Sequence, residues 1–396
     1  MRILRSIHTL NPEIGGPIES VRQSSAVLRR LGHEVEVATL DGPNDPWIHE
    51  APFTVHALGP GRGSYGYSAH FMPWIKERRR EFDAVLVHGV WQYSSFGVWR
   101  ALHGSSTPYF VLPHGMLDPW FKRTYPLKHV KKMLYWPWAE YRVLRDAAAV
   151  LFTSQEEMRL AHQSFLPYRC NEVVINYGTT APDVDLPAAE REFLTKFPEL
   201  CGKRILLFLG RLHEKKGCDL LIEAFAALRE PESTDKERNL QLVIAGPSSD
   251  QAYLAHLKQL ATSVSGKRQE DIPIKFIGML SGSLKWGALS AADAFVLPSH
   301  QENFGIAVVE ALACATPVLI SNKVNIWREI VDDGAGLAEE DDHDGTRRLL
   351  DRWLGLSEQE RDKMRMNARK SFDRRFHVDQ AVESLLHVMT HPPKPR

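Results

Sequence analysis

The sequence predicts an α/β protein built from two tandem, doubly wound, Rossmann-like domains. Short apolar runs alternate with amphipathic segments along the chain, which is the pattern of βα units around parallel sheets. The chain has 396 residues, more than one ordinary core accommodates, and this length favours two domains. Ligands of such sheets bind beyond the carboxyl ends of the strands, so we expect an active site in a cleft between two facing sheets.

Two series of apolar runs are the strand candidates. Those of the first half are Arg2–His8, Val35–Thr39, Ala84–His88, Tyr109–Leu112, Val150–Thr153 and Val173–Ile175. Those of the second half are Ile205–Leu209, Leu242–Ala245, Ile274–Ile277, Ala294–Leu297 and Val318–Ser321. We expect an N-terminal domain over 1–180, an interdomain linker rich in Pro, Ala and acidic residues over 181–200, and a second domain over 201–375.

Composition is that of an ordinary folded protein, with 43% apolar and 25% charged residues. Lys plus Arg and Asp plus Glu number 49 each, so the protein has no net positive charge that would attract nucleic acid or an anionic membrane. The four cysteines are scattered and form no C-x-x-C pair, which argues against a structural zinc site and against a disulfide scaffold. This cysteine usage fits a protein of the reducing cytosol. The N-terminus has the pattern of a first strand rather than a signal peptide, and no run of about 18 apolar residues occurs. We therefore expect a cytoplasmic protein.

A glycine pair, Gly15 and Gly16, follows the first strand and precedes a helix expected to run to about Leu31. Glycines there let backbone amides approach a phosphate or carboxylate at the helix N-terminus. A flexible turn without a ligand is the alternative.

Two cations, Arg211 and Lys216, lie between a strand and the amphipathic helix "CDLLIEAFAALRE". Arg offers a planar fork of donors and Lys a point charge, so together they suit a diphosphate leaving group that gains negative charge. Lys215 is interpreted as solvated.

His114, in "VLPHGMLDP", follows a strand end in a tight loop between Pro113 and Gly115. This position favours a functional role over a structural one. His8, His88 and His213 also end or follow strands and rank lower. No histidine and acid pair has metal-ligand spacing, so we expect no metal.

Two acids, Glu302 and Glu310, flank a Gly and a helical pattern in "SHQENFGIAVVEALACATPVLIS". On one helix they would stand about 12 Å apart along the axis, too far for a tight acid/base dyad. We expect Glu302 in a loop, Gly305 opening a helix and Glu310 inside it, so that the two acids hold different parts of one ligand.

The stretches "GGPIESVRQSSAVLRRLGHEVEVATL", "GRLHEKKGCDLLIEAF" and "ADAFVLPSHQENFGIAVVEALACATPVL" together resemble the retaining glycosyltransferases of family four, which have the GT-B fold. The resemblance implies that Glu302 contacts sugar hydroxyls and Glu310 the nucleotide ribose. It also implies that the amides around Asn303, Phe304 and Gly305 hold the sugar and the diphosphate.

By the same resemblance Arg211 and Lys216 match the diphosphate pair, Gly16 the N-terminal glycine loop, and His114 the histidine that contacts the donor sugar. The implied catalytic residues are Glu302, His114, Arg211 and Lys216. The family mechanism retains anomeric configuration without a protein nucleophile. The nucleotide diphosphate sugar is a co-substrate, and no other cofactor is expected.

Two segments depart from the family pattern. Asn176 and Tyr177 precede Gly178 where the family usually has Pro-Asn-Gly. The end of the chain, 376–396, resembles the terminal helix that returns to the first domain, with His377 where an aromatic residue is common.

Residues 120–145 hold seven Lys and Arg, one acid and seven aromatics. Basic charge interleaved with Trp and Tyr is typical of a membrane-interface surface, which could dock the protein beside a lipid-linked acceptor. In the alternative, Leu127, Val130, Leu134 and Trp138 simply face the core at helical spacing.

The sequence thus predicts a retaining hexosyltransferase that acts on a glycan or lipid-linked saccharide, in polysaccharide biosynthesis, with possible peripheral contact at the inner membrane face and no nucleic-acid partner. A GT-B sugar-nucleotide epimerase and an inactive nucleotide-sugar-binding assembly protein are the alternatives. Donor, acceptor, linkage and oligomeric state are not specified by these patterns.

Overall fold

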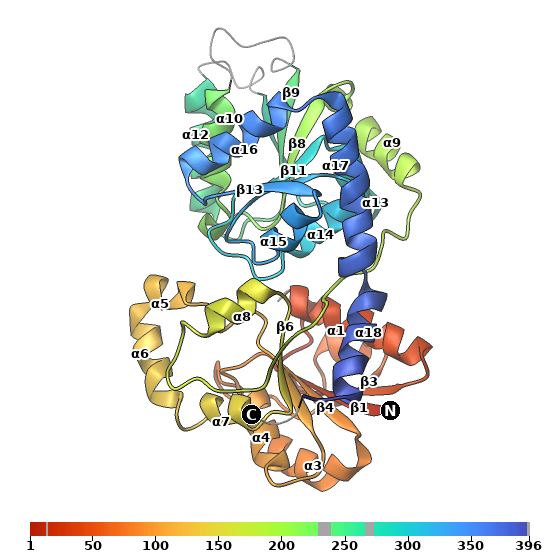
Figure 1. The fold of residues 1–396 in the computed structure, drawn as a ribbon, viewed down its shortest axis with the longest axis vertical. Coiled ribbons are helices and arrows are strands. Elements are labelled where there is room, and N and C mark those ends of the chain that lie inside the picture. Colours follow the sequence, from red (N-terminus) through yellow and green to blue (C-terminus); the bar gives the residue numbers. More distant parts are fainter. Residues whose placement is uncertain (13–14, 229–238, 266–272, 394–396) are drawn as a thin grey trace. The chain divides into compact units, whose positions relative to one another are not determined.

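The computed structural model describes residues 1–12, 15–228, 239–265 and 273–393. The chain forms two compact units, which are described separately (Figure 1). Unit 1 comprises Met1–Gly178 with Val378–Arg396, and unit 2 comprises Thr179–His377. Each unit contains one parallel sheet with helices, which confirms the predicted α/β class.

The sheet of unit 1 has the order β3-β2-β1-β4-β5-β6-β7, with every neighbouring pair parallel. Its central strands are buried apolar runs, as expected where helices cover both faces. The strands are β1 (Arg2–Ile7), β2 (Glu34–Thr39), β3 (Thr54–Ala57), β4 (Ala84–His88), β5 (Tyr109–Leu112), β6 (Ala149–Phe152) and β7 (Glu172–Val174).

The helices of unit 1 include α18, which packs beside α1. They are α1 (Gly16–Arg30), α2 (Pro46–His49), α3 (Phe71–Arg78), η2 (Arg79–Glu81), α4 (Tyr93–Leu102), α5 (Trp120–Thr124), α6 (Pro126–Tyr135), α7 (Glu140–Arg145), α8 (Gln155–Ala161) and α18 (Val378–Thr390).

The sheet of unit 2 has the order β10-β9-β8-β11-β12-β13, again with parallel neighbours. The strands are β8 (Arg204–Leu209), β9 (Leu240–Ala245), β10 (Ile274–Gly278), β11 (Ala294–Leu297), β12 (Val318–Ser321) and β13 (Gly336–Glu339). The helices are α9 (Leu186–Lys196), η3 (Pro198–Leu200), η4 (Glu214–Lys216), α10 (Cys218–Ala227), α12 (Gln251–Ser265), α13 (Gly282–Ala291), α14 (Ile306–Ala313), α15 (Trp327–Asp332), α16 (His343–Gly355), α17 (Glu358–Ser371) and η6 (Phe372–Phe376).

The range expected to be a linker, 181–200, is instead part of unit 2. It contains α9, which packs closely on α13. A Cβ atom on Gly287 would lie only 2.1 Å from the carbonyl oxygen of Ala189, so the close contact between the two helices requires a glycine there. A Pro- and Ala-rich acidic stretch therefore forms an anchored helix here.

The units join at two chain crossings, after Gly178 and after His377. Thr179 lies beside His377 as an isolated parallel bridge, and its amide donates to the carbonyl of Phe376 at 3.0 Å. Residues 376 and 377 thus belong to unit 2, and the returning segment begins at Val378 rather than at 376.

The strand order reverses between β1 and β4 in unit 1 and between β8 and β11 in unit 2. Open α/β sheets bind ligands outside the carboxyl ends of the strands at such a switch point. In unit 2 this criterion selects the loops that follow Leu209 of β8 and Leu297 of β11. Most of the predicted site residues lie in or directly after these loops.

Candidate active site

The segment that follows β11 has the predicted arrangement. Gly305, with φ of 72°, is the N-cap of α14, Glu302 lies in the preceding loop, and Glu310 lies inside the helix. A Cβ atom on Gly305 would approach Val308 Cγ2 to 3.1 Å in a backbone conformation that side chains rarely adopt. Glycine at this position lets the chain turn sharply from the loop into the helix.

The loop at Glu302 is fixed by the segment after β12. The amide of Glu302 donates to the carbonyl of Lys323 at 3.0 Å, and the amide of Asn325 donates to the carbonyl of Glu302 at 2.9 Å. The side-chain amide of Asn325 also donates to Oδ1 of Asn303 at 3.2 Å. Both backbone polar groups of Glu302 are therefore hydrogen-bonded, which fixes the position from which its carboxylate extends.

Lys216, at the end of η4, contacts the carboxylate of Glu302 through its ammonium. The side chains are 20% and 19% exposed, so solvent screens this pair only partly. Burial raises the pKa of Glu302, but the charge and hydrogen bond of Lys216, with the amide of Gly305, outweigh it and leave the pKa below its ordinary value. Glu302 is consequently ionised at neutral pH.

The loops after β8 and β11 meet through their backbones. The carbonyl of Lys215 accepts hydrogen bonds from the amide of His300 at 2.8 Å and from the hydroxyl of Ser299 at 2.9 Å. A Cβ atom on Gly217, whose φ is 66°, would lie 2.3 Å from the carbonyl oxygen of Pro298. This close approach places Lys216 against the second loop.

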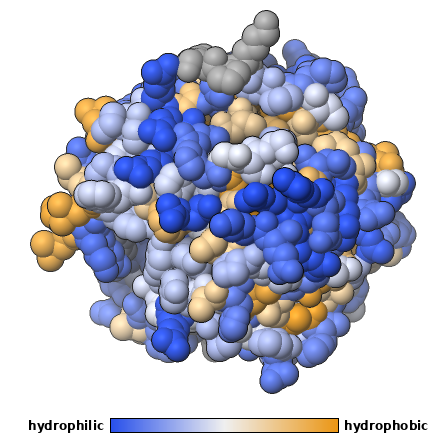
Figure 2. Space-filling view, turned by 90° about the horizontal axis from the view of Figure 1, so that it is seen from below, coloured by the Kyte–Doolittle hydropathy of each residue, from blue (hydrophilic) through white to orange (hydrophobic). Residues whose placement is uncertain are grey.

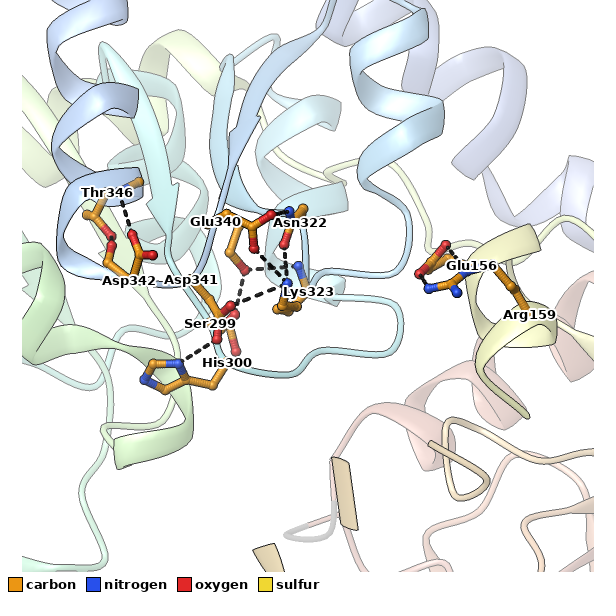
Figure 3. A network of polar contacts seen from close by, with 12 residues as sticks. Glu156, Arg159, Ser299, His300, Asn322, Lys323, Glu340, Asp341, Asp342 and Thr346 are labelled. Carbon is orange, nitrogen blue, oxygen red and sulfur yellow. Dashed lines mark hydrogen bonds and ion pairs between the residues drawn. The ribbon is translucent and has the colours of Figure 1, made fainter. Parts of the chain in front are cut away.

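A network of ion pairs supports the same loop (Figure 3). His300 Nδ1 lies 2.9 Å from Asp341 Oδ2, and Lys323 Nζ lies 2.9 Å from Glu340 Oε2 and 3.4 Å from Asp341 Oδ1. The hydrogen bond to Asp341 raises the pKa of His300 in spite of its burial. These residues could not be recognised in the sequence, because Glu340 and Asp341 follow β13, a strand that the apolar pattern does not predict.

Glu310 has a partner that the sequence did not reveal. Lys285 of α13 donates to Glu310 Oε1 at 2.7 Å, and its ammonium also lies 4.2 Å from the ring centroid of Trp286. The Glu310 side chain is 12% exposed, so its carboxylate is held in place. The second acid is thus also positioned, through its ion pair with Lys285.

Arg211 lies in the loop after β8 and is exposed. Within the described parts of the chain it makes no ion pair. The structure therefore brings Lys216, Glu302 and Gly305 together but leaves the Arg211 guanidinium free to meet a ligand.

His114 lies in unit 1, directly beyond β5, with an unusual φ of 51°. Its Nε2 is 3.1 Å from Nδ1 of His88, and the two rings stack with centroids 5.3 Å apart. Burial, helped by the charge of Arg5, lowers the pKa of His114 to about 4. His114 is therefore neutral at pH 7, with a hydrogen-bonding role rather than a charged one.

The His114 loop is held by a buried acid, Glu157 of α8. One carboxylate oxygen accepts from the amide of Gly115 at 2.6 Å, and the other from the amide of Thr153 at 2.7 Å. Ser154 caps α8 by accepting from the amide of Glu157. The sequence signal was present, since Ser154 and Glu157 have the spacing of a capping box.

Gly15 is the N-cap of α1, with φ of 97°. Among the described residues other than its chain neighbours, no atom lies within 4 Å of a Cβ built on Gly15. The predicted strand, glycine turn and helix are present, and Gly16 is the first residue of α1. A ligand role for Gly15 and Gly16 stays a prediction.

Two family profiles cover most of the chain. Residues 190–371 match "Glycosyl transferases group 1", and residues 15–178 match "Glycosyl transferase 4-like domain". The chain belongs to the group 1 glycosyltransferases. This membership confirms the resemblance found in the sequence motifs.

Individual relatives of this glycosyltransferase are distant. A D-inositol 3-phosphate glycosyltransferase of Kineococcus radiotolerans is 35% identical over 132 residues, 33% of this chain and only 30% of the relative. Mannosylfructose-phosphate synthase of Agrobacterium fabrum is 23% identical over 80% of this chain and 73% of that protein.

Solved structures share the GT-B fold with this glycosyltransferase. HepE of Anabaena, in complex with UDP, has a TM-score of 0.76 at 18% identity, covering 98% of this chain and 100% of that one. Sucrose-phosphate synthase of Thermosynechococcus elongatus has a TM-score of 0.73 at 19% identity, covering 98% of both chains. At such identities the likeness concerns the fold.

The described ranges contain no group of three or more His, Cys, Asp or Glu arranged to hold a metal ion. They also contain no helix with the length and apolarity needed to cross a membrane. Metal independence stays a prediction.

Proposed function

We propose that this protein is a retaining glycosyltransferase that moves a hexosyl group from a nucleotide diphosphate sugar to a glycan or lipid-linked saccharide. The observation that carries the proposal is the contact of Lys216 with Glu302 at the start of α14, with Glu310 inside the same helix. A cation, a helix N-terminus and two separate carboxylates match the parts of one donor molecule.

Each part of the donor has a suitable group. The diphosphate is bound by Lys216, by Arg211 and by backbone amides at the N-terminus of α14. Two carboxylates accept hydrogen bonds from vicinal hydroxyls, Glu302 from the sugar and Glu310 from the ribose. Lys216 already contacts the carboxylate of Glu302. When a diphosphate binds, the Lys216 ammonium therefore lies between two anions, the diphosphate and the Glu302 carboxylate.

The chemistry follows from the charges. The bond between the anomeric carbon and the diphosphate oxygen breaks, and Lys216 and Arg211 stabilise the negative charge on the leaving group. Glu302 is engaged by a cation and serves to orient the sugar. The acceptor oxygen bonds to the anomeric carbon on the face that the diphosphate leaves, and the leaving oxygen takes the proton of the acceptor hydroxyl, so retention needs no protein nucleophile. His114 is the remaining predicted catalytic residue, and it is a neutral hydrogen-bonding group.

The first donor base to test is uracil. HepE of Anabaena has been solved with UDP and with UDP-glucose. Because the likeness to HepE concerns the fold, UDP-glucose is the starting point of a panel that also contains GDP and ADP sugars.

An exposed apolar face in unit 1 supports the proposed membrane contact. Leu127, Val130, Leu134 and Trp138 are 86%, 56%, 73% and 69% exposed. The alternative that these side chains simply face the core is therefore wrong. In Figure 2 apolar side chains gather at the left edge, the side on which α5 and α6 lie in Figure 1.

Basic side chains surround this face. Lys122, Lys128 and Lys131 are exposed, and an apolar stripe flanked by lysines suits an anionic lipid surface. We propose that α6 (Pro126–Tyr135) docks peripherally at the cytoplasmic face of a membrane, where a lipid-linked acceptor would be within reach.

The test is a transferase assay with each donor and a mixture of lipid-linked saccharides, followed by NMR of the product and repeated with a chelator. The proposal predicts release of nucleoside diphosphate and a glycoside with the anomeric configuration of the donor, both insensitive to the chelator. Free epimerised sugar without an acceptor would indicate the epimerase, and donor binding without turnover would indicate the inactive binding protein. Activity lost with the chelator and restored by a divalent ion would contradict metal independence.

A further inference from the structure

A small cavity lies inside unit 1, and all of its lining residues belong to that unit. It has a volume of about 20 Å³ and is lined by β1, β4, α1, the segment 175–178 and α18. Its polar lining includes Arg5, Ser20, Ser24, His88 and Tyr177. A cavity of this volume holds one particle the size of a water molecule.

The cavity contains an uncompensated charge. Arg5 projects from the middle of β1 and is 1% exposed, yet its Nε and Nη2 atoms have no hydrogen-bond partner among the described residues. No described carboxylate forms an ion pair with Arg5. Buried guanidinium groups are almost always paired, because an isolated charge loses its hydration on burial.

The neighbouring titratable groups do not supply the missing negative charge. Burial lowers the pKa of Arg5 to about 10, so Arg5 is still protonated at pH 7. Burial raises the pKa of Tyr177 to about 12, which leaves its phenol neutral. His88 is also neutral, because burial and the charge of Arg5 hold its pKa well below the ordinary value.

We propose that this cavity binds a small monovalent anion, with chloride as the physiological candidate, between the guanidinium of Arg5 and the ring of His88. The Nε2 atom of His88 is buried and has no described partner, and in the tautomer protonated there it is a further donor. A chloride ion is only slightly larger than water, so it fits a cavity of this volume.

Occupation of the cavity also sets the tautomers of the histidine pair. With a proton on Nε2 of His88, its Nδ1 is an acceptor, and the 3.1 Å contact is a donation from Nε2 of His114. A water molecule in the cavity, which can itself donate to His88, would allow the opposite tautomer. The anion therefore fixes which nitrogen of His114 carries its proton.

The cavity joins segments that are far apart in the sequence. The α18 residues Val378, Ala381, Val382 and Leu385 contribute to its apolar lining, together with Leu86 of β4 and Leu112 of β5. An anion at Arg5 consequently stabilises the packing of α18 against the rest of unit 1. Chloride is expected to raise the thermal stability of the protein.

The first test is thermal unfolding of the purified protein in chloride and in gluconate at one constant ionic strength. Gluconate is too large for the cavity and keeps screening unchanged. A tenfold excess of chloride over its dissociation constant is expected to raise the Tm by about 3 to 6 °C, with saturation. The same increase is expected with bromide.

The variant Arg5→Met keeps a long side chain and removes the charge, so its Tm is expected to be the same in both salts. Arg2→Gln is the matched control. Arg2 lies on the same strand but forms an ion pair with Glu36 at 2.7 Å, so its removal is expected to leave the chloride response intact.

The direct test needs no variant and remains available if Arg5→Met does not fold. Crystals of the wild-type protein grown in bromide are expected to show an anomalous peak within hydrogen-bond distance of the Arg5 guanidinium. Water alone at that position, a Tm that is indifferent to halide, or a chloride response that persists in Arg5→Met would each overturn the proposal.

Discussion

The ammonium of Lys216 contacts the carboxylate of Glu302, although the two residues are 86 positions apart in the chain. The contact exists because β8 and β11 are neighbours in the sheet and the loops beyond them share hydrogen bonds. A cation and an acid that lie on separate loops thereby become one preorganised charge pair.

Replacing Lys216 by Gln is expected to weaken binding of the preferred nucleoside diphosphate about 10- to 100-fold, because one charge-assisted hydrogen bond is lost. Lys215→Gln is the matched control, since it removes the same charge from the adjacent position and is expected to change affinity less than twofold. Isothermal titration calorimetry measures both. Equal losses in the two variants would show that general charge, and not Lys216, holds the diphosphate.

Arg211→Ala is expected to reduce kcat more than it weakens donor binding. The exposed guanidinium has no ion pair among the described residues and is free to meet charge that develops on the leaving group. Steady-state kinetics with a fixed acceptor separates the two effects. Wild-type kcat with a raised KM would assign Arg211 to ground-state binding only.

Glu310→Ala is expected to weaken nucleotide binding about tenfold through loss of the ribose hydroxyl contacts, and it also leaves Lys285 without its carboxylate. Glu199→Ala removes an acid of unit 2 that is 42% exposed and paired with Lys275, outside the candidate site, and it serves as the control. Binding of nucleosides that lack a 2′-hydroxyl should respond little to Glu310→Ala. An unchanged affinity for ribonucleotides would contradict the assignment.

The stability of the protein should depend on pH through His88 and His114. Both pKa values are lower in the folded state than the ordinary 6.5, to about 4 for His114, so their contribution to the free energy of unfolding is complete above pH 6.5. It is lost as the pH falls from 6.5 towards 4, at up to about 1.4 kcal/mol per pH unit for each histidine.

Denaturant titrations at pH 7, 6 and 5 measure this slope. His114→Gln is expected to flatten it, whereas replacing the exposed His49 by Gln is expected to leave it unchanged. A slope that is the same in both variants would mean that other groups cause the acid destabilisation.

The apolar face of α6 is expected to bind anionic lipid. At low salt the protein should sediment with vesicles that contain phosphatidylglycerol, and the bound fraction should fall as salt screens the lysines. The double variant Leu127→Asp, Leu134→Asp should remain in the supernatant. Val331→Asp, at a position of unit 2 that is 39% exposed, should bind like the wild type. Failure of the wild-type protein to sediment would remove the membrane contact from the account.

Most of the fold could be predicted from the sequence, because buried parallel strands appear as uninterrupted apolar runs between turn residues. The strands β3 and β13 were not predicted. Both lie at sheet edges, and Thr54–Ala57 has no buried residue, so no apolar run marks it. The sequence indicated the fold class but not the order of the strands in each sheet, because strand pairing depends on contacts between distant segments.

The candidate site was predictable where function requires unusual residues, such as the glycine that opens α14 or the cation next to a strand end. Its supporting groups were not. Lys285, His300 and Asp341 are ordinary surface residue types, and only the folded chain brings them against Glu310 and the Glu302 loop. The burial of Arg5 could not be predicted either, because a charged side chain in the first strand is expected to face solvent.

Calorimetric titration of UDP, GDP and ADP into the wild-type protein and into Glu310→Ala tests the central claim most directly. The account predicts that one of the three binds selectively to the wild type, with exothermic saturation, and loses about tenfold in affinity in the variant. No binding of any nucleotide, or binding that Glu310→Ala leaves unchanged, would contradict the claim that unit 2 holds a nucleotide diphosphate sugar through this segment.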